Sequence, residues 1–326
     1  MSILRRPGAV ALFMLAWFAA ALPTTVAQPF PTRPVRLVVP YPPGGANDAV
    51  ARLLAPKLGE LLGQNVVVDN RGGGNTIIGS ELVAKAVPDG HTLLIVAAGH
   101  AINPSLYPRL PYDTARDFAP VALVGDGAYV LVVSPSLGVS STPELIAAAK
   151  AKPGQILYAS SSTGNLTHLA AEVFNALGGV KMVHVPYKGG GPAMIDLLGG
   201  RVAVFFSTVA VARPHLQSGK IKGLGVTTAR RSAALPNLPT IAESGLPGYE
   251  VSGWYGFVAP AATPRPAIAK LYGAVQTVIR QAEVKDKLLA VGVDTVEMTT
   301  AQFGQRIASE LVKWNRIVKP LGITPD

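Results

Sequence analysis

Residues 34–48, PVRLVVPYPPGGAND, decide the fold of this chain. The apolar run 35–39 lies between two prolines, which is typical of a short buried strand. A loop with two glycines follows, and beyond it apolar residues recur on one broad face of a helix, which Pro56 is expected to kink. The order strand, glycine loop, helix indicates an α/β domain whose loops lie at the carboxyl ends of parallel strands.

The same alternation continues along most of the chain. Strands are expected at 65–68, 92–97, 129–133, 156–159, 183–185, 202–206, 224–227 and up to Pro260, whereas 104–120 is expected to be irregular. Two helices close the chain, one from Thr263 to about Gln281 and one capped by Thr300. Because these helices have no strands of their own, they are expected to cover the first sheet.

The chain is therefore expected to form two α/β lobes. Lobe 1 combines residues 28–128 with residues 252–326, and lobe 2 consists of residues 129–251. The chain crosses near Tyr129 and returns near Trp254, so hinge strands are expected at these two points. A ligand cleft is expected between the two lobes.

The composition is that of a folded protein. Of 326 residues, 49% are hydrophobic and 15% are charged, which is too apolar for a disordered chain and sufficient to bury a core. The sequence contains no cysteine, which excludes disulfides, thiolate metal sites and cysteine nucleophiles.

Residues 1–27 have the pattern of a cleaved secretory signal. Arg5 and Arg6 precede an apolar run at 9–22, and Thr25-Val26-Ala27 offers small residues before Gln28. A retained membrane anchor is the alternative, but the run is shorter than the roughly 20 residues that span a bilayer. Export by the general or the twin-arginine route stays open. The mature protein is expected to be soluble and outside the cytoplasm.

The net charge favours small anionic ligands. It is +10 for the whole chain, and loss of the two signal arginines leaves 27 basic against 19 acidic residues. The basic residues are scattered, with no stripe of aromatic and basic side chains, so no nucleic-acid partner is expected.

No catalytic constellation is visible. The five histidines show no metal-ligand spacing, and neither a His-Glu-x-x-His nor a Gly-x-Ser-x-Gly motif occurs. The glycine runs 72–74 and 189–191 lack the dinucleotide and P-loop patterns. We therefore expect no enzyme activity, no metal and no cofactor.

Three loops stand between a strand and a helix: 42–48, 160–165 and 188–192. Such loops meet at one sheet edge, where helix N-termini offer free N–H groups and a positive dipole end. Gly44 and Gly45 leave room for an anion at the backbone, and Asn47 or Asp48 can cap the helix. The pattern predicts a carboxylate site that needs no arginine.

The chain resembles the extracytoplasmic solute receptors of tripartite tricarboxylate transporters, the Bug/TctC type. The resemblance covers nearly the whole mature chain and rests on segments 34–45, 68–71, 88–94, 101–107, 112–113, 117–121, 184–189 and 235–240. It implies a two-lobed periplasmic binding protein of the type II-like fold, each lobe a mixed sheet flanked by helices. A small carboxylate and the permease subunits of the transporter are the implied partners, and a monomer is expected.

The resemblance also implies where the ligand is held. In lobe 1 the matching positions are Pro43, Gly44, Gly45, Ala46 and Asp48, with Asn47 in place of a commoner threonine. In lobe 2 they are Ser160, Ser161, Ser162, Gly164, Asn165 and Thr167. Many members carry aspartate after the strand 202–206, where this chain has Ser207 and Thr208, and this difference disfavours an amino-acid ligand.

Four further residues are candidates with open alternatives. Tyr187 and Lys188 adjoin the third loop, and the lysine either meets a distal carboxylate or is solvated. Trp254 is a cleft wall or a core residue of the hinge, and His100 follows a strand end and either faces the cleft or is buried elsewhere.

A receptor that hands a carboxylate to a permease is the leading interpretation. A periplasmic ligand sensor is the alternative, because the same fold serves both roles. A periplasmic enzyme, or a receptor for another solute such as an aromatic acid or a peptide, is less favoured. The sequence does not name the ligand.

Overall fold

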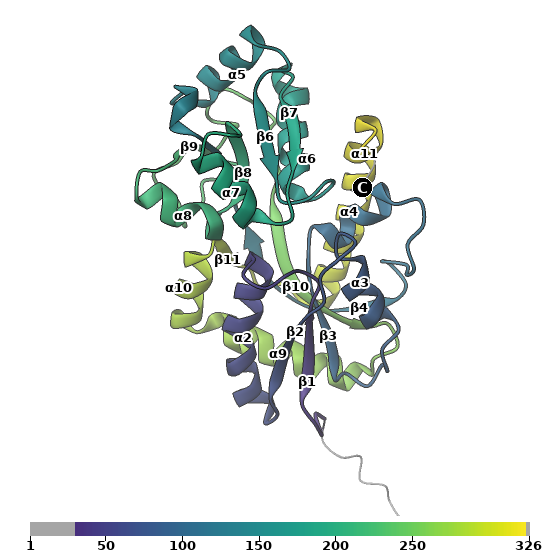
Figure 1. Cartoon of the computed structure of the whole chain (residues 1–326). Coiled ribbons are helices and arrows are strands. Elements are labelled where there is room, and N and C mark those ends of the chain that lie inside the picture. Colours follow the sequence, from purple (N-terminus) through teal and green to yellow (C-terminus); the bar gives the residue numbers. More distant parts are fainter. Residues whose placement is uncertain (1–29, 324–326) are drawn as a thin grey trace, which may run out of the picture.

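The structure is a computed structural model, and it describes residues 30–323. The expected signal segment 1–27 therefore lies outside the described residues. Two mixed β-sheets form, each with helices on both faces (Figure 1). This arrangement confirms the predicted α/β class with two mixed sheets. No helix between residues 30 and 323 is long and apolar enough to cross a membrane.

The first sheet has six strands in the order β11-β4-β10-β3-β1-β2. Strands β1, β2 and β3 run parallel, whereas β10 is antiparallel to both β3 and β4. Their bounds are β1 Val35–Val39, β2 Val66–Asn70, β3 Thr92–Ala97, β4 Phe118–Gly127, β10 Gly253–Pro260 and β11 Val293–Thr295.

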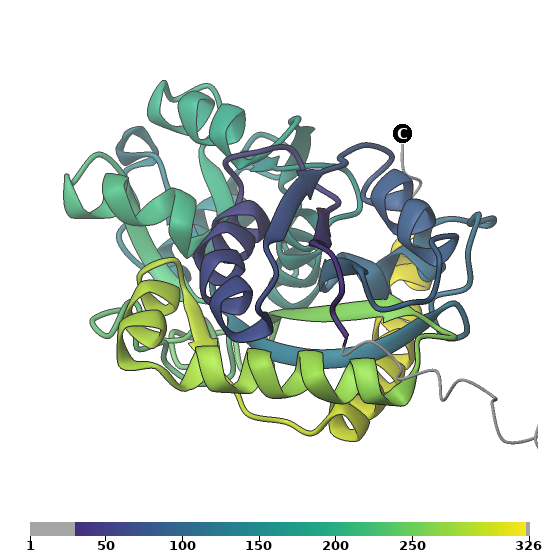
Figure 2. The ribbon, with the colours of Figure 1, turned by 90° about the horizontal axis from the view of Figure 1, so that it is seen from below.

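Six helices cover this sheet. One face packs on α2 Ala46–Leu62, α9 Arg265–Arg280 and α10 Ala282–Ala290, and Figure 2 shows α9 lying along the strands. The other face packs on α3 Ile77–Ala84, α4 Gly99–Leu106 and α11 Thr300–Leu321. The two closing helices α9 and α11 thus cover the first sheet, as the sequence predicts.

The second sheet has five strands in the order β7-β6-β8-β5-β9. The strands are β5 Tyr129–Val133, β6 Leu157–Ser160, β7 Val183–Pro186, β8 Val204–Thr208 and β9 Lys222–Val226. Its helices are α5 Thr142–Ala151, α6 Leu166–Gly178, α7 Gly190–Leu198 and α8 Val209–Gln217, with a short 3₁₀ turn at Pro135–Leu137. One apolar core runs from α11 under the first sheet to α6 under the second.

The two sheets are joined where strands end. Only Ala128 separates β4 of the first sheet from β5 of the second. The chain returns after β9 through residues 227–252 to β10, which pairs with β4 along its whole length. The two connections therefore run side by side between the first sheet and the second.

The stretch 104–120, expected to be irregular, is partly ordered. Helix α4 extends to Leu106 although it contains Pro104, and β4 begins at Phe118. The ladder shifts register between Phe257 and Val258, next to the place where Pro120 pairs with Val258. Because β11 pairs with β4 only at residues 125–127, β4 is an edge strand at Pro120, and the irregular ladder accommodates the proline. The sequence analysis also did not predict helices α8 and α10 or the short strand β11.

Candidate functional site

The loops after β6 and β7 lie side by side because these strands are parallel neighbours. The amide of Gly189 donates to the Ser161 carbonyl at 2.9 Å, and the amide of Tyr187 donates to the Ser160 carbonyl at 3.0 Å. Strand β8 lies on the other side of β6 and ends at Ser207 and Thr208. The polar candidates of the second sheet are therefore gathered at one edge.

The glycine loop after β1 leads directly into α2. Gly44 has φ 86°, a left-handed conformation that suits glycine, and Gly45 is the N-cap of the helix. None of the side chains that the structure describes caps this N-terminus. The amides of Ala46, Asn47 and Asp48 belong to the first turn, which has no intrahelical acceptor for them.

Asp48 holds this loop instead of capping the helix. Its carboxylate accepts from the Gly44 amide at 2.9 Å and from Asn70 Nδ2 at 2.9 Å, and it pairs with Arg52 at 3.0 Å. Burial would raise the pKa of Asp48, but the hydrogen bonds from Arg52, Gly44 and Asn70 outweigh it and keep the pKa below its ordinary value. The carboxylate is thus ionised and fully occupied within the protein.

The serine-rich loop before α6 is organised by its own side chains. Asn165 caps α6 by accepting from the amides of Thr167 and His168 at 3.1 and 3.2 Å. Thr167 Oγ1 accepts from the Ser161 amide at 2.8 Å, and Asn165 Nδ2 donates to Ser161 Oγ at 2.5 Å. These bonds fix the loop as a rigid turn, with Gly164 at φ 75°.

Four other candidate residues around the second sheet differ in how far contacts within the protein hold their side chains. The Tyr187 hydroxyl donates to Asp196 at 2.7 Å, and Arg201 pairs with the same carboxylate. Lys188 is exposed. Ser207 is fully buried and donates to the Thr208 carbonyl at 3.1 Å. Thr208 is the N-cap residue of α8 without a side-chain cap bond.

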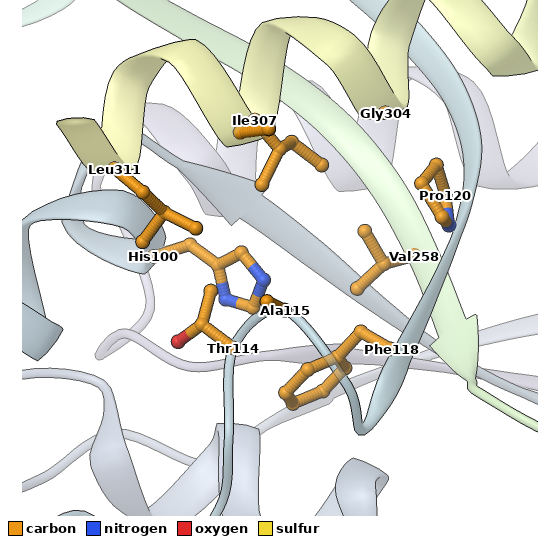
Figure 3. A pocket seen from close by; sticks show the side chains of 10 residues that line it. His100, Thr114, Ala115, Phe118, Pro120, Val258, Gly304, Ile307 and Leu311 are labelled. Atoms are coloured by element: carbon orange, nitrogen blue, oxygen red, sulfur yellow. The ribbon is translucent and has the colours of Figure 1, made fainter. Parts of the chain in front are cut away.

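His100 lies apart from the three loops. Its ring packs edge-on against Phe118 at 4.8 Å, in a pocket of about 220 Å³ beneath α11 (Figure 3). Burial lowers the pKa of His100 to about 4, so the ring is neutral at physiological pH. The structure thus places this residue under α11, because α4 turns its side chain towards that helix.

Trp254 is also buried away from the loops. It is 0% exposed and packs edge-on against Phe303 of α11, with ring centroids 5.7 Å apart. Of the two alternatives for this residue, the structure favours the core of the connection between the sheets.

Sequence reasoning missed two groups of residues near the loops. Tyr41, Tyr129 and Tyr255 come together where the sheets join, and burial raises the pKa of Tyr129 to about 12, so its phenol stays protonated. His168 and His184 lie behind the serine-rich loop. Two signals in the sequence could have pointed to these groups. Tyr129 stands where the chain crosses between the expected lobes, and His168 follows the cap residue Asn165 by three positions.

The fold and the loops at its strand ends define a two-sheet solute receptor of the periplasmic binding class. Residues 50–323 match the family model described as "Tripartite tricarboxylate transporter family receptor". The chain belongs to this family, which confirms the resemblance seen in the sequence.

Two relatives extend this result. The chain is 40% identical to the "UPF0065 protein in tcbD-tcbE intergenic region" of Pseudomonas sp. strain P51, over 94% of this chain and 93% of that protein. It is 38% identical to protein BugT of Bordetella pertussis, over 91% of each. The match with BugT agrees with the Bug/TctC resemblance.

Two solved structures share the fold along their whole length. Rpa4515 of R. palustris with adipate is 38% identical, has a TM-score of 0.86, and aligns over 91% of this chain and 100% of its own. MatC (Rpa3494) from Rhodopseudomonas palustris with bound malate is 31% identical, has a TM-score of 0.81, and aligns over 89% and 100%. Both are structures of dicarboxylate complexes.

Proposed function

We propose that this chain captures a small carboxylate in the periplasm and delivers it to the permease of a tripartite tricarboxylate-type transporter. The observation that carries the proposal is the α2 N-terminus, which opens beside Gly44 and Gly45 without a side-chain cap. In a family whose members include the adipate and malate complexes, such an end suits a carboxylate.

The charges around the loop support recognition by the backbone. The cations nearest to the glycine loop are already paired, Arg52 with Asp48 and Arg71 with Asp69. A carboxylate is therefore bound by neutral N–H and hydroxyl donors, which are effective where the helix dipole points at the anion. Because Ser207 and Thr208 carry no negative charge, a plain carboxylate is favoured over an amino acid.

The two sheets with their helices are the two lobes of this receptor. Lobe 1 contributes the glycine loop, lobe 2 contributes the serine-rich loop, and the ligand lies between them. The chain acts as a monomeric receptor and not as an enzyme, and it is exported with cleavage of residues 1–27. Intact mass of the exported protein checks the last point: a mature chain that begins at Gln28 is expected, and retention of residues 1–27 contradicts it.

A thermal-shift panel tests the ligand class. Adipate, malate, benzoate and aspartate are each added to the mature protein, with glycerol as an uncharged control. A ligand at about 100 times its Kd stabilises the folded state by about 2.7 kcal/mol, which gives a clear rise in Tm. We expect adipate or malate, dicarboxylates without an amino group, to give the largest rise and the amino acid aspartate a smaller one. If none of the carboxylates raises the Tm, the proposal is overturned.

A further inference from the structure

Two histidines from different elements stack behind the serine-rich loop. His168 of α6 and His184 of β7 have ring centroids 3.7 Å apart and planes inclined by 8°. His168 is only 5% exposed, and the Tyr158 ring of β6 lies beside the pair, 5.1 Å from the His184 ring and 6.1 Å from the His168 ring. Imidazoles in face-to-face contact are stable when at most one carries a charge, because two positive charges this close repel strongly.

Each ring holds one end of the loop. His168 Nδ1 accepts from the Gly164 amide at 2.9 Å. His184 Nε2 lies 2.6 Å from Ser160 Oγ, which itself donates to the Ser162 carbonyl at 3.1 Å. A hydroxyl has one proton, so Ser160 accepts from His184 and the Nε2 of that ring carries a proton.

These contacts define the protonation state of His168. Its Nδ1 is an acceptor, so the neutral ring carries its proton on Nε2, which lies 4.0 Å from Glu172. Glu172 also accepts from the Tyr158 hydroxyl and, at 3.3 Å, from Asn175 Nδ2.

Few other titratable groups face the pair. Tyr158 is the contribution of β6, His184 that of β7 and Glu172 that of α6 itself, while β8 carries none. Tyr249, whose hydroxyl donates to the Ala170 carbonyl, reaches α6 from the segment before β10. Burial raises the pKa of Tyr249 well above its usual value, so it stays neutral. Glu172 is the carboxylate that these contacts place beside the histidine pair.

We propose that His168 and His184 form a brace that holds the loop 160–165 in its carboxylate-receiving form, and that protonation of His168 releases the loop and weakens binding. The proposal rests on the function proposed above. A proton on His168 Nδ1 turns an acceptor into a donor that faces the donor N–H of Gly164. The ligand-free loop can rearrange to relieve this conflict, whereas the ligand-bound loop cannot.

The direction of the pH effect follows by linkage. Because the free protein accepts a proton that the complex excludes, carboxylate affinity falls as the pH decreases, by at most about tenfold per pH unit for one proton. Simple attraction between a new positive charge and the anionic ligand predicts the opposite slope. The sign of the slope therefore separates the brace from a purely electrostatic role.

The first experiment needs no ligand. In the mature protein at pH 8.0, NMR of the imidazole nitrogens is expected to show His168 neutral with its proton on Nε2. On acidification, the Gly164 amide resonance is expected to shift together with the titration of His168. A proton on Nδ1 at pH 8.0, or a Gly164 amide that does not respond, overturns the proposal whatever the ligand is.

The second experiment measures adipate binding by calorimetry at pH 8.0 and pH 6.0. For the wild type we expect Kd to rise about threefold or more at pH 6.0. His168→Asn places an amide oxygen near the Nδ1 position, so it keeps an acceptor for Gly164 but cannot titrate. We expect it to bind at pH 8.0 within about threefold of the wild type and to lose the pH dependence.

Matched variants complete this design. His215→Asn changes a histidine of α8 outside the cluster and should leave the pH dependence intact. His168→Ala removes the acceptor and should weaken binding at both pH values. Retained pH dependence in His168→Asn, or tighter wild-type binding at pH 6.0, contradicts the brace. Failure of the wild type to bind adipate at pH 8.0 counts against adipate as the ligand, and the NMR result then decides on the brace.

Discussion

Asp48 shows how single residues act in this protein: side chains hold loops in place, and the loops present backbone groups. Its carboxylate binds Gly44, Asn70 and Arg52, and so holds the glycine loop in place instead of capping the first turn of α2. Asn165 has the same role in the serine-rich loop. We therefore expect main-chain amides and hydroxyl groups to recognise the ligand at this scale.

Replacement of Asp48 tests its role in stability. Because the folded-state pKa of Asp48 is depressed, its stabilisation is present above the unfolded value of about 3.9 and is lost as the pH falls through the folded value. We expect Asp48→Asn to lower the free energy of unfolding at pH 7 by about 1–3 kcal/mol. As the pH is lowered, the free energy of unfolding of this variant should decrease less than that of the wild type. Urea unfolding between pH 3 and pH 7 measures both effects.

A matched acidic residue provides the control. Glu283 pairs with Lys287 on the exposed surface of α10, where ion pairs contribute little. Glu283→Gln should leave the unfolding curve at pH 7 nearly unchanged. Equal effects of the two substitutions would contradict a special role for Asp48.

Gly45 is the residue at which ligand approach is tested. A Cβ there would meet only the Pro42 carbonyl, at 4.0 Å, and φ −84° is accessible to valine, so Gly45→Val should fold normally. We expect its branched side chain to keep a carboxylate from the α2 amides. Loss of such bonds costs roughly 1.5–3 kcal/mol each, which is at least about a tenfold rise in Kd.

Lys188→Ala is the comparison for this variant. Lys188 is exposed, and an exposed ion pair is worth about 0–1 kcal/mol, so Kd should change little. Calorimetry with adipate measures both variants. A larger loss for Lys188→Ala would mean that a side-chain charge holds the carboxylate.

Helices and strands contribute at the next scale by where their ends and faces lie. Helix α2 directs its uncapped N-terminus to the loop edge, and α11 buries Phe303 and Trp314 against the first sheet. Helix α11 begins with a capping box between Thr299 and Gln302, one residue before the predicted cap Thr300. Gly256 of β10 allows this helix to approach the sheet closely, because a Cβ there would meet the Phe303 ring.

Gly256 of β10 tests that close approach. A Cβ there would overlap the Phe303 ring and lie 2.9 Å from the Ala122 carbonyl, so Gly256→Ala should destabilise by about 1–3 kcal/mol through overpacking. Gly273 lies inside α9 with nothing within 4 Å of its added Cβ, so Gly273→Ala should stabilise by about 0.5–1 kcal/mol. Urea unfolding compares them, and the same sign of change for both would refute this account of α11 packing.

For the whole molecule, we expect the two strand connections to let the two sheets move as units. The sheets also touch at a distance from the connections: Arg213 of α8 donates to the Ala290 carbonyl of α10 at 3.1 Å (Figure 1). Leu106 of α4 lies against Gly164 of the serine-rich loop. Such contacts are suited to a closed form around a ligand.

We expect adipate to make the protein more compact in solution. Closure brings α8 to α10 and the two loops together, so the radius of gyration from small-angle scattering should decrease on addition of ligand. Glycerol at the same concentration should leave it unchanged. An unaltered radius of gyration at saturating adipate would argue against closure between the lobes.

Local signals were sufficient for a large part of this structure. Strand β1, its glycine loop and α2 follow from short-range patterns, and the structure has each of them. Strand β4 was missed because Pro120, Gly125 and Gly127 are typical of turns. A proline is accepted in a strand at an edge or at an irregularity of the ladder, and these positions depend on long-range strand pairing that no local pattern reveals.

The sequence by itself determined the α/β class, the family and the loops at which helices begin, because strand periodicity, glycine positions and helix ends depend on neighbouring residues. The tertiary structure alone decided that β10 lies between β3 and β4, that His100 is buried under α11, and that His168 stacks on His184. These features join residues far apart in the chain. Their energies come from packing and from hydrogen bonds that exist only once the sheets have formed.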